Sequence, residues 1–150
     1  MITTLAVISL IVLTTYLVYM AVRYGVKEYV SDNYYVSNHN YMFTAVMLVV
    51  GITLLPSMMD KGGDFRFLSM FASFGLILVA MEPHYKAERM HAVGAVMTLV
   101  SGTVWVATFH PIIVSIALVC WASYKLLKLP KPYYWGEVAA FALIYGTILL

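Results

Sequence analysis

Charged residues are scarce in this chain. It contains 9 lysines and arginines and 7 aspartates and glutamates in 150 residues, so that 11% of the residues are charged and 63% are hydrophobic. A water-soluble domain of this size needs far more polar surface, and we therefore expect a lipid bilayer to surround the chain. A net charge of +2, with no basic patch among aromatic residues, argues against a nucleic-acid partner.

Cysteine is almost absent as well. Cys120 is the only one, which excludes an intramolecular disulfide and a CxxC metal or redox site. It lies within an apolar run, where we expect it to act as a small apolar residue. The sequence also lacks linkers, low-complexity tracts and blocks of like charge. Residues 1–150 are therefore predicted to form a single domain.

Long apolar runs make up most of the chain. Six are found, at residues 2–22, 41–59, 65–81, 83–109, 112–127 and 133–150. The first would form a helix about 31 Å long at ~1.5 Å per residue, enough to cross a hydrocarbon core of ~30 Å. One helix over residues 83–127 would be about 67 Å long at the same rise, so the chain must reverse at His110-Pro111. We predict an all-α fold, a polytopic membrane bundle of six transmembrane helices.

Two connections between these runs carry residues that favour a helix boundary. Gly62 and Gly63 follow the second run, and their backbone freedom suits a tight turn. Pro83 suits the first position of the fourth helix, with Glu82 favourable near the positive end of the helix dipole.

Lysine and arginine are distributed unevenly among the loops. Seven follow the first, third and fifth runs: Arg23, Lys27, Lys86, Arg89, Lys125, Lys128 and Lys131. Two follow the second and fourth runs: Lys61 and Arg66. Because basic loops of multi-span proteins stay in the cytoplasm, these counts place the connections after the first, third and fifth runs of a multi-pass protein on the cytoplasmic side. We expect the membrane itself to be a bacterial inner membrane. Both chain ends are then extracytoplasmic.

The fourth run contains a polar stripe at helical spacing. Its members are His84, Glu88, His91, Ala95, Thr98 and Gly102, and the opposite face carries Val93, Val96, Leu99, Val100 and Val104. Ionisable side chains are costly in hydrocarbon, whereas small residues let a neighbouring helix approach closely. We therefore expect the stripe to face the interior of the bundle and the valine-rich face to meet lipid.

The ionisable members of this stripe allow two interpretations. His84, Glu88 and His91 can converge on a divalent metal such as zinc, or form a proton relay, with His39 or Asp32 as a further ligand. In a metal hydrolase acting on lipid, Glu88 or Asp32 would activate water. Alternatively the three side chains form a polar cap at the interface, in which Glu88 pairs with a neighbouring base.

Two further segments carry polar chemistry. The connection at residues 23–40 holds four tyrosines among balanced charges, and is either a ligand- or partner-facing platform or an aromatic anchor lying in the headgroups. Glu137 lies about one turn into the last run. Its carboxylate either extends to the interface or pairs with Lys131, or alternatively it couples transport, and the Gly136/Ala140 and Ala142/Gly146 pairs indicate close helix packing.

Several short motifs lie between residues 31 and 91: Ser31-Asp32-x-Tyr34-Tyr35, Leu55-Pro56 and Glu82-Pro83-His84, followed by His91. Over this stretch the chain resembles a family of small uncharacterised multi-span integral membrane proteins of bacteria and phages, which has no assigned activity. The serine-aspartate segment with histidines is also similar to the ceramidase and adiponectin-receptor superfamily, which implies a membrane-embedded metal hydrolase. That superfamily has seven spans and an HxxxH pair on the last one, whereas the last run here has no histidine.

Three functions are compatible with these patterns. No charged residue lies at mid-membrane depth, where pumps and transporters keep their relays. This favours a non-enzymatic accessory or interaction component, with a membrane-protein partner or further copies of the chain. The first alternative is the metal-dependent lipid hydrolase. The second is an ion or small-solute permease that uses Glu137 and the polar stripe.

Overall fold

The computed structural model of the protein describes residues 2–36, 41–85 and 88–150, without the side chains of residues 2, 82–85 and 88. All regular secondary structure in these ranges is helical, which confirms the predicted all-α class. The helices are α1 (Ile2–Tyr24), α2 (Asn33–Val36), α3 (Tyr41–Lys61), α4 (Phe67–Tyr85), α5 (Glu88–Phe109), α6 (Pro111–Leu126) and α7 (Pro132–Leu149).

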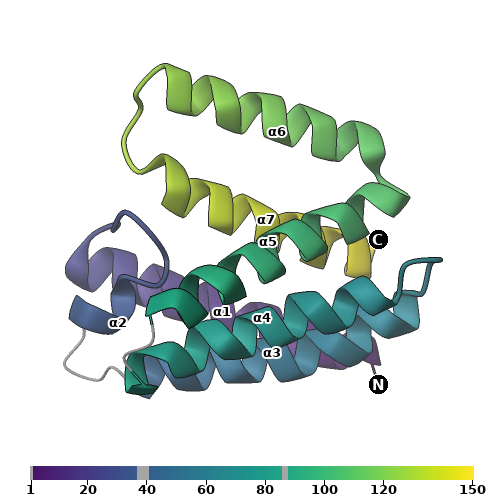
Figure 1. The fold of residues 1–150 in the computed structure, drawn as a ribbon, viewed down its shortest axis with the longest axis horizontal. Helices are drawn as coiled ribbons and strands as arrows, with labels where there is room; N and C mark the ends of the chain where they lie inside the picture. Colours follow the sequence, from purple (N-terminus) through teal and green to yellow (C-terminus); the bar gives the residue numbers. More distant parts are fainter. Residues whose placement is uncertain (1, 37–40, 86–87) are drawn as a thin grey trace.

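The six long helices run up and down in alternation (Figure 1). Both chain ends lie at one end of the bundle, together with the α3–α4 and α5–α6 turns. At the opposite end lie the described parts of the α1–α3 and α6–α7 connections, the end of α4 and the start of α5, and with them most of the lysines and arginines of the described residues. We call this opposite end the basic end.

Length and composition mark this as a membrane protein. Among the described residues, three helical stretches are long and apolar enough to cross a bilayer: Thr3–Tyr24, Tyr41–Lys61 and Arg89–Phe109. Two shorter apolar stretches lie in α4 and α6, at Phe67–Met81 and Pro111–Leu126.

Most predicted helix boundaries agree with the structure. α5 ends at Phe109 and α6 begins at Pro111, which confirms the reversal at His110-Pro111. Gly62 and Gly63 have φ angles of +84° and +87° in the α3–α4 turn. These values lie in the left-handed region that glycine adopts without steric cost.

The predicted start of a helix at Pro83 is wrong. α4 continues through Pro83 to Tyr85, and the next helix begins at Glu88. Proline lacks the N–H that would bond to the Val79 carbonyl, but this loss affects one bond in the last turn of the helix. His84 therefore belongs to α4, so the predicted single-helix stripe of His84, Glu88 and His91 does not exist.

Glycines place α4 and α5 in direct backbone contact. A β-carbon on Gly75 would lie 2.6 Å from the Gly94 carbonyl oxygen, and one on Gly94 would lie equally close to the Gly75 oxygen. Beside this crossing, the Thr98 hydroxyl donates a hydrogen bond of 3.1 Å to the Ala72 carbonyl. Thr98 and Gly102 are buried, as the predicted inward stripe requires. The contact fixes the position of α5 within the bundle.

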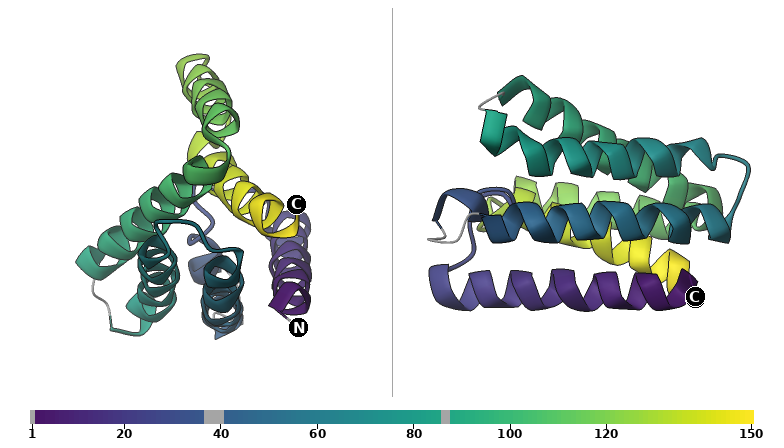
Figure 2. Two further views of the ribbon diagram at one scale, coloured as in Figure 1. Left: turned by 90° about the vertical axis from the view of Figure 1, so that its right-hand side faces the viewer. Right: turned by 90° about the horizontal axis from the view of Figure 1, so that it is seen from below.

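α6 stands apart from the other helices (Figure 2). Val114 is its one buried residue, whereas Ile112, Ile116 and Val119 are 74%, 59% and 65% exposed. α7, by contrast, packs back onto α1, where the Ser9 and Tyr145 hydroxyls share a buried hydrogen bond of 2.6 Å.

Candidate functional site

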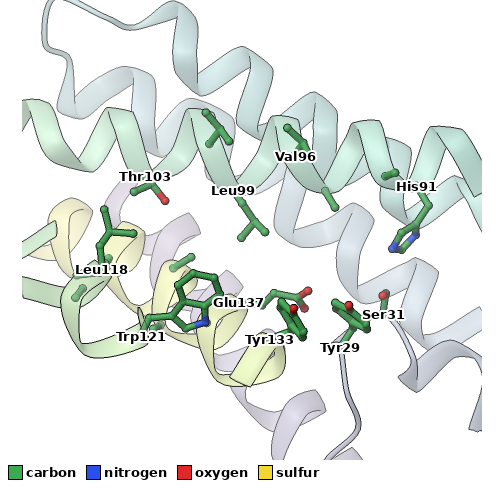
Figure 3. A pocket seen from close by; sticks show the side chains of 18 of the residues that line it. Tyr29, Ser31, His91, Val96, Leu99, Thr103, Leu118, Trp121, Tyr133 and Glu137 are labelled. Carbon is green, nitrogen blue, oxygen red and sulfur yellow. The ribbon is translucent and has the colours of Figure 1, made fainter. Parts of the chain in front are cut away.

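A cavity of about 850 Å³ lies between α5, α6, α7 and the segment that follows α1. We call it the cleft (Figure 3). Its volume is in the range of ~300–1,000 Å³ that is usual for small-molecule sites. Val96 and Val100 of its α5 wall remain 60% and 56% exposed, so the cleft is open to the outside of the bundle.

Most of the cleft wall is apolar. α5 contributes a row of valines and Leu99, α6 contributes Leu118, and α7 contributes Leu143. The α5 valines belong to the face that the sequence predicted to meet lipid, and their exposure agrees with that prediction. Along α5 the wall extends from His91 to Val104, about 20 Å at ~1.5 Å per residue.

Polar side chains gather at the basic end of the cleft. Figure 3 shows Tyr29, Tyr133 and Glu137 lying together there, with His91 and Ser31 nearby. Asp32 and Tyr35 complete the polar lining from the segment after α1. These groups come from four parts of the chain: the 29–35 segment, α5, α7 and, through the Trp121 ring, α6.

Glu137 holds the segment after α1 against α7. The Val30 backbone N–H donates a hydrogen bond of 2.8 Å to Glu137 Oε2, and the Val30 side chain is buried. The predicted pairing of Glu137 with Lys131 is wrong, because Lys131 Nζ lies 3.2 Å from Glu28 Oε2 instead. Lys131 precedes α7, and the segment after α1 places the Glu28 carboxylate next to it.

Aromatic rings reinforce this junction. Tyr29 stacks on Tyr133 with 5.2 Å between ring centroids. The Lys125 ammonium lies 4.9 Å from the Tyr133 centroid and 5.6 Å from that of Trp121. Both distances are within the ~6 Å over which cation–π attraction acts. Tyr29 is thus tied to α7, and residues 29, 31, 32 and 35 line the cleft. The ligand-platform interpretation of this connection stays a prediction.

The Trp121 indole joins α6 to the start of α7. Its Nε1–H donates a hydrogen bond of 2.8 Å to the Pro132 carbonyl oxygen. Gly136 makes room for the ring, because a β-carbon at that position would lie 2.6 Å from Trp121 Nε1. The predicted close packing at Gly136 is therefore confirmed. Gly146 has nothing within 4 Å of such a β-carbon, so the packing predicted there is not found.

The electrostatic environment at the polar end is negative. The pKa of Tyr29 is raised, first by partial desolvation, and then by Tyr133 and the carboxylates of Glu28, Glu137 and Asp32. A negative neighbour opposes formation of a second negative charge, so the nearby carboxylates add to the effect of desolvation on this pKa. Among the described lining residues, His91 is the sole basic side chain.

Three of the predicted site residues meet in the cleft: Asp32, His91 and Glu137. His39 and the side chains of His84 and Glu88 lie outside the described residues. Within the described part of the chain, no three potential metal ligands lie close enough together to hold an ion. The metal-hydrolase and permease hypotheses therefore stay predictions.

Tyr29, Tyr133, Trp121 and the α6 wall were not identified from the sequence as site residues. Tyrosine at a predicted span end is also typical of a residue that anchors a helix at the interface, and this was the more general interpretation of both tyrosines. Comparison of the chain with protein-family models, with curated proteins and with solved structures yields no match.

Proposed function

We propose that this chain is a six-span membrane protein without enzymatic activity that binds a membrane amphiphile in the cleft. The bound molecule is a lipid whose chain lies along the valine wall and whose headgroup meets the polar end. This is an accessory function: the protein retains or presents a lipid and leaves it chemically unchanged.

The alternating arrangement of the six long helices supports six spans. All connections rich in lysine and arginine fall at the basic end, which we place on the cytoplasmic side by the charge rule. α4 and α6 have 19 and 16 residues, or about 28 and 24 Å at ~1.5 Å per residue. Local thinning of a bilayer accommodates helices slightly shorter than its ~30 Å core.

The observation that carries the lipid proposal is the division of the cleft into one long apolar wall and one polar end. The wall measures about 20 Å at ~1.5 Å per residue, whereas one leaflet contributes about half of a ~30 Å hydrocarbon core. A single acyl chain, about 15 Å long on this measure, therefore fits within the length of the wall and matches it in polarity. Because α6 stands apart, such a chain has lateral access from the bilayer.

Filling the cleft is expected to abolish lipid binding. Ala117 lines the cleft from α6, and in Ala117→Phe the added ring would occupy the space of the acyl chain. We expect one amphiphile per wild-type chain and at least a ten-fold weaker Kd in the variant. Binding is measured by native mass spectrometry and by titration in detergent micelles, using oleylamine, oleyl alcohol and oleate as ligands.

Ala122→Phe is the matched control. Ala122 is an exposed residue of α6 outside the cleft lining, so it tests the effect of the same substitution without blocking the site. It should bind as the wild type does. The proposal is refuted if none of the three amphiphiles binds saturably, or if the two variants lose affinity equally.

A further inference from the structure

The two carboxylates of the cleft define the charge of the group that fits there. Asp32 and Glu137 both line the polar end. Each uses one oxygen to accept a backbone N–H: Asp32 Oδ2 from Tyr29 at 3.0 Å and Glu137 Oε2 from Val30 at 2.8 Å. Among the described residues, no donor is recorded for the other oxygen of either carboxylate. Both side chains are thus positioned by the backbone while keeping capacity to accept further hydrogen bonds.

The two lysines near this end do not pair with the carboxylates of the cleft. Lys131 pairs with Glu28 outside the cleft lining. Lys125 lies over the Tyr133 and Trp121 rings and is also outside the lining. Within the described part of the chain, neither lysine forms an ion pair with Asp32 or Glu137. A cation entering the cleft therefore meets two carboxylates that no lysine of the described residues neutralises, with His91 as the basic side chain of the same lining.

The aromatic residues at this end also favour a positively charged ligand. The position of Lys125 shows that the Tyr133 and Trp121 rings accept an ammonium group at 4.9 and 5.6 Å. Their faces carry the negative part of the ring quadrupole, which attracts cations and repels anions.

From these contacts, and resting on the proposed lipid-binding function, we infer that the cleft selects an amphiphile with a cationic amine headgroup. The ammonium group donates hydrogen bonds to Asp32 and Glu137, beside the Tyr29–Tyr133 pair, and the aliphatic chain follows the α5 wall. An ammonium has three donors and no acceptor, which complements two carboxylates. An anionic headgroup would be repelled by both carboxylates in a partly desolvated site, where charges interact more strongly than in water.

Three ligands with the same C18 chain isolate the headgroup. At pH 7, oleylamine carries a positive charge, oleyl alcohol none and oleate a negative charge. We expect oleylamine to bind at least ten-fold more tightly than oleyl alcohol, and oleate to bind more weakly than either. Equilibrium titration in a non-ionic detergent at low salt gives the three Kd values for the wild-type protein.

Substitution of the carboxylates tests their role. Glu137→Gln keeps an oxygen that accepts the Val30 N–H but removes the charge, and Asp32→Asn does the same for Tyr29. Each should reduce the preference for oleylamine over oleyl alcohol by at least three-fold. Asp60→Asn is the matched control, because Asp60 is an exposed carboxylate at the other end of the bundle and outside the lining, and it should change the preference by less than two-fold.

The results separate this inference from the proposed function. Equal binding of the three ligands, or tighter binding of oleate, overturns the amine selectivity while leaving lipid binding intact. Failure of all three to bind overturns both. The wild-type comparison decides the selectivity even if a carboxylate variant does not fold.

Discussion

Replacing Gly94 with alanine is expected to destabilise the bundle by about 1–3 kcal/mol, the usual cost of overpacking a close contact. The new β-carbon would lie 2.6 Å from the Gly75 carbonyl oxygen and 3.0 Å from the Val79 backbone nitrogen. Backbone atoms cannot move aside as the tip of a side chain can, so α4 and α5 must separate. The thermal unfolding midpoint should fall by several degrees, which circular dichroism in detergent measures.

Gly146→Ala provides the control for helix propensity. Alanine stabilises a helix interior over glycine by roughly 0.5–1 kcal/mol, and at Gly146 no atom lies within 4 Å of the added carbon. This variant should be as stable as the wild type or slightly more stable. Equal unfolding midpoints for Gly94→Ala and Gly146→Ala would show that α4 and α5 do not cross at Gly75 and Gly94.

Cysteine labelling near the helix ends is expected to alternate along the chain, with each position either fully accessible from outside the cell or not at all. In a Cys120→Ala background, single cysteines replace Asp64, His110 and Leu129, which lie between successive helices, and Arg89, which is the second residue of α5. If α4, α5 and α6 all cross the bilayer, the positions alternate between its two sides. A membrane-impermeant maleimide added to intact bacterial cells should label positions 64 and 110 and leave 89 and 129 unreacted.

Each neighbouring pair of positions tests one helix. Labelling of 64 and 89 from the same side would mean that α4 does not cross, and labelling of 110 and 129 from the same side would mean the same for α6. Permeabilised cells, in which all four positions should react, control for accessibility. Alternation with positions 89 and 129 labelled instead would retain six spans and reverse the proposed orientation.

The helix order was predictable because bilayer thickness limits helix length. The reversal at His110-Pro111 followed from length alone, since no polar residues other than His110 mark it. Burial of Thr98 and Gly102 followed from the cost of polar groups in lipid and from the close approach that small residues permit. These arguments use local sequence and general properties of the membrane, so they need no knowledge of long-range contacts.

The cleft was not predictable, because it depends on where α6 lies. Every face of α6 is apolar, so its sequence does not indicate which side packs and which meets lipid. The hydrogen-bond partner of Glu137 was not predictable either, because it is the backbone N–H of Val30, 107 residues away in the chain. A main-chain donor carries no side-chain signal, whereas Lys131 lay nearby in sequence and suggested an ion pair that Glu28 forms instead.

Photolabelling with a lipid tests the central claim most directly. An oleylamine analogue with a diazirine on its chain is added at one molecule per protein in bilayer nanodiscs and activated by light. Peptide mapping should place the adducts on the cleft-facing residues Val96, Val100, Val104 and Leu118. Adducts spread evenly over other exposed apolar residues of the bundle, such as Ile11, Phe71 and Phe74, would contradict a lipid site between α5, α6 and α7.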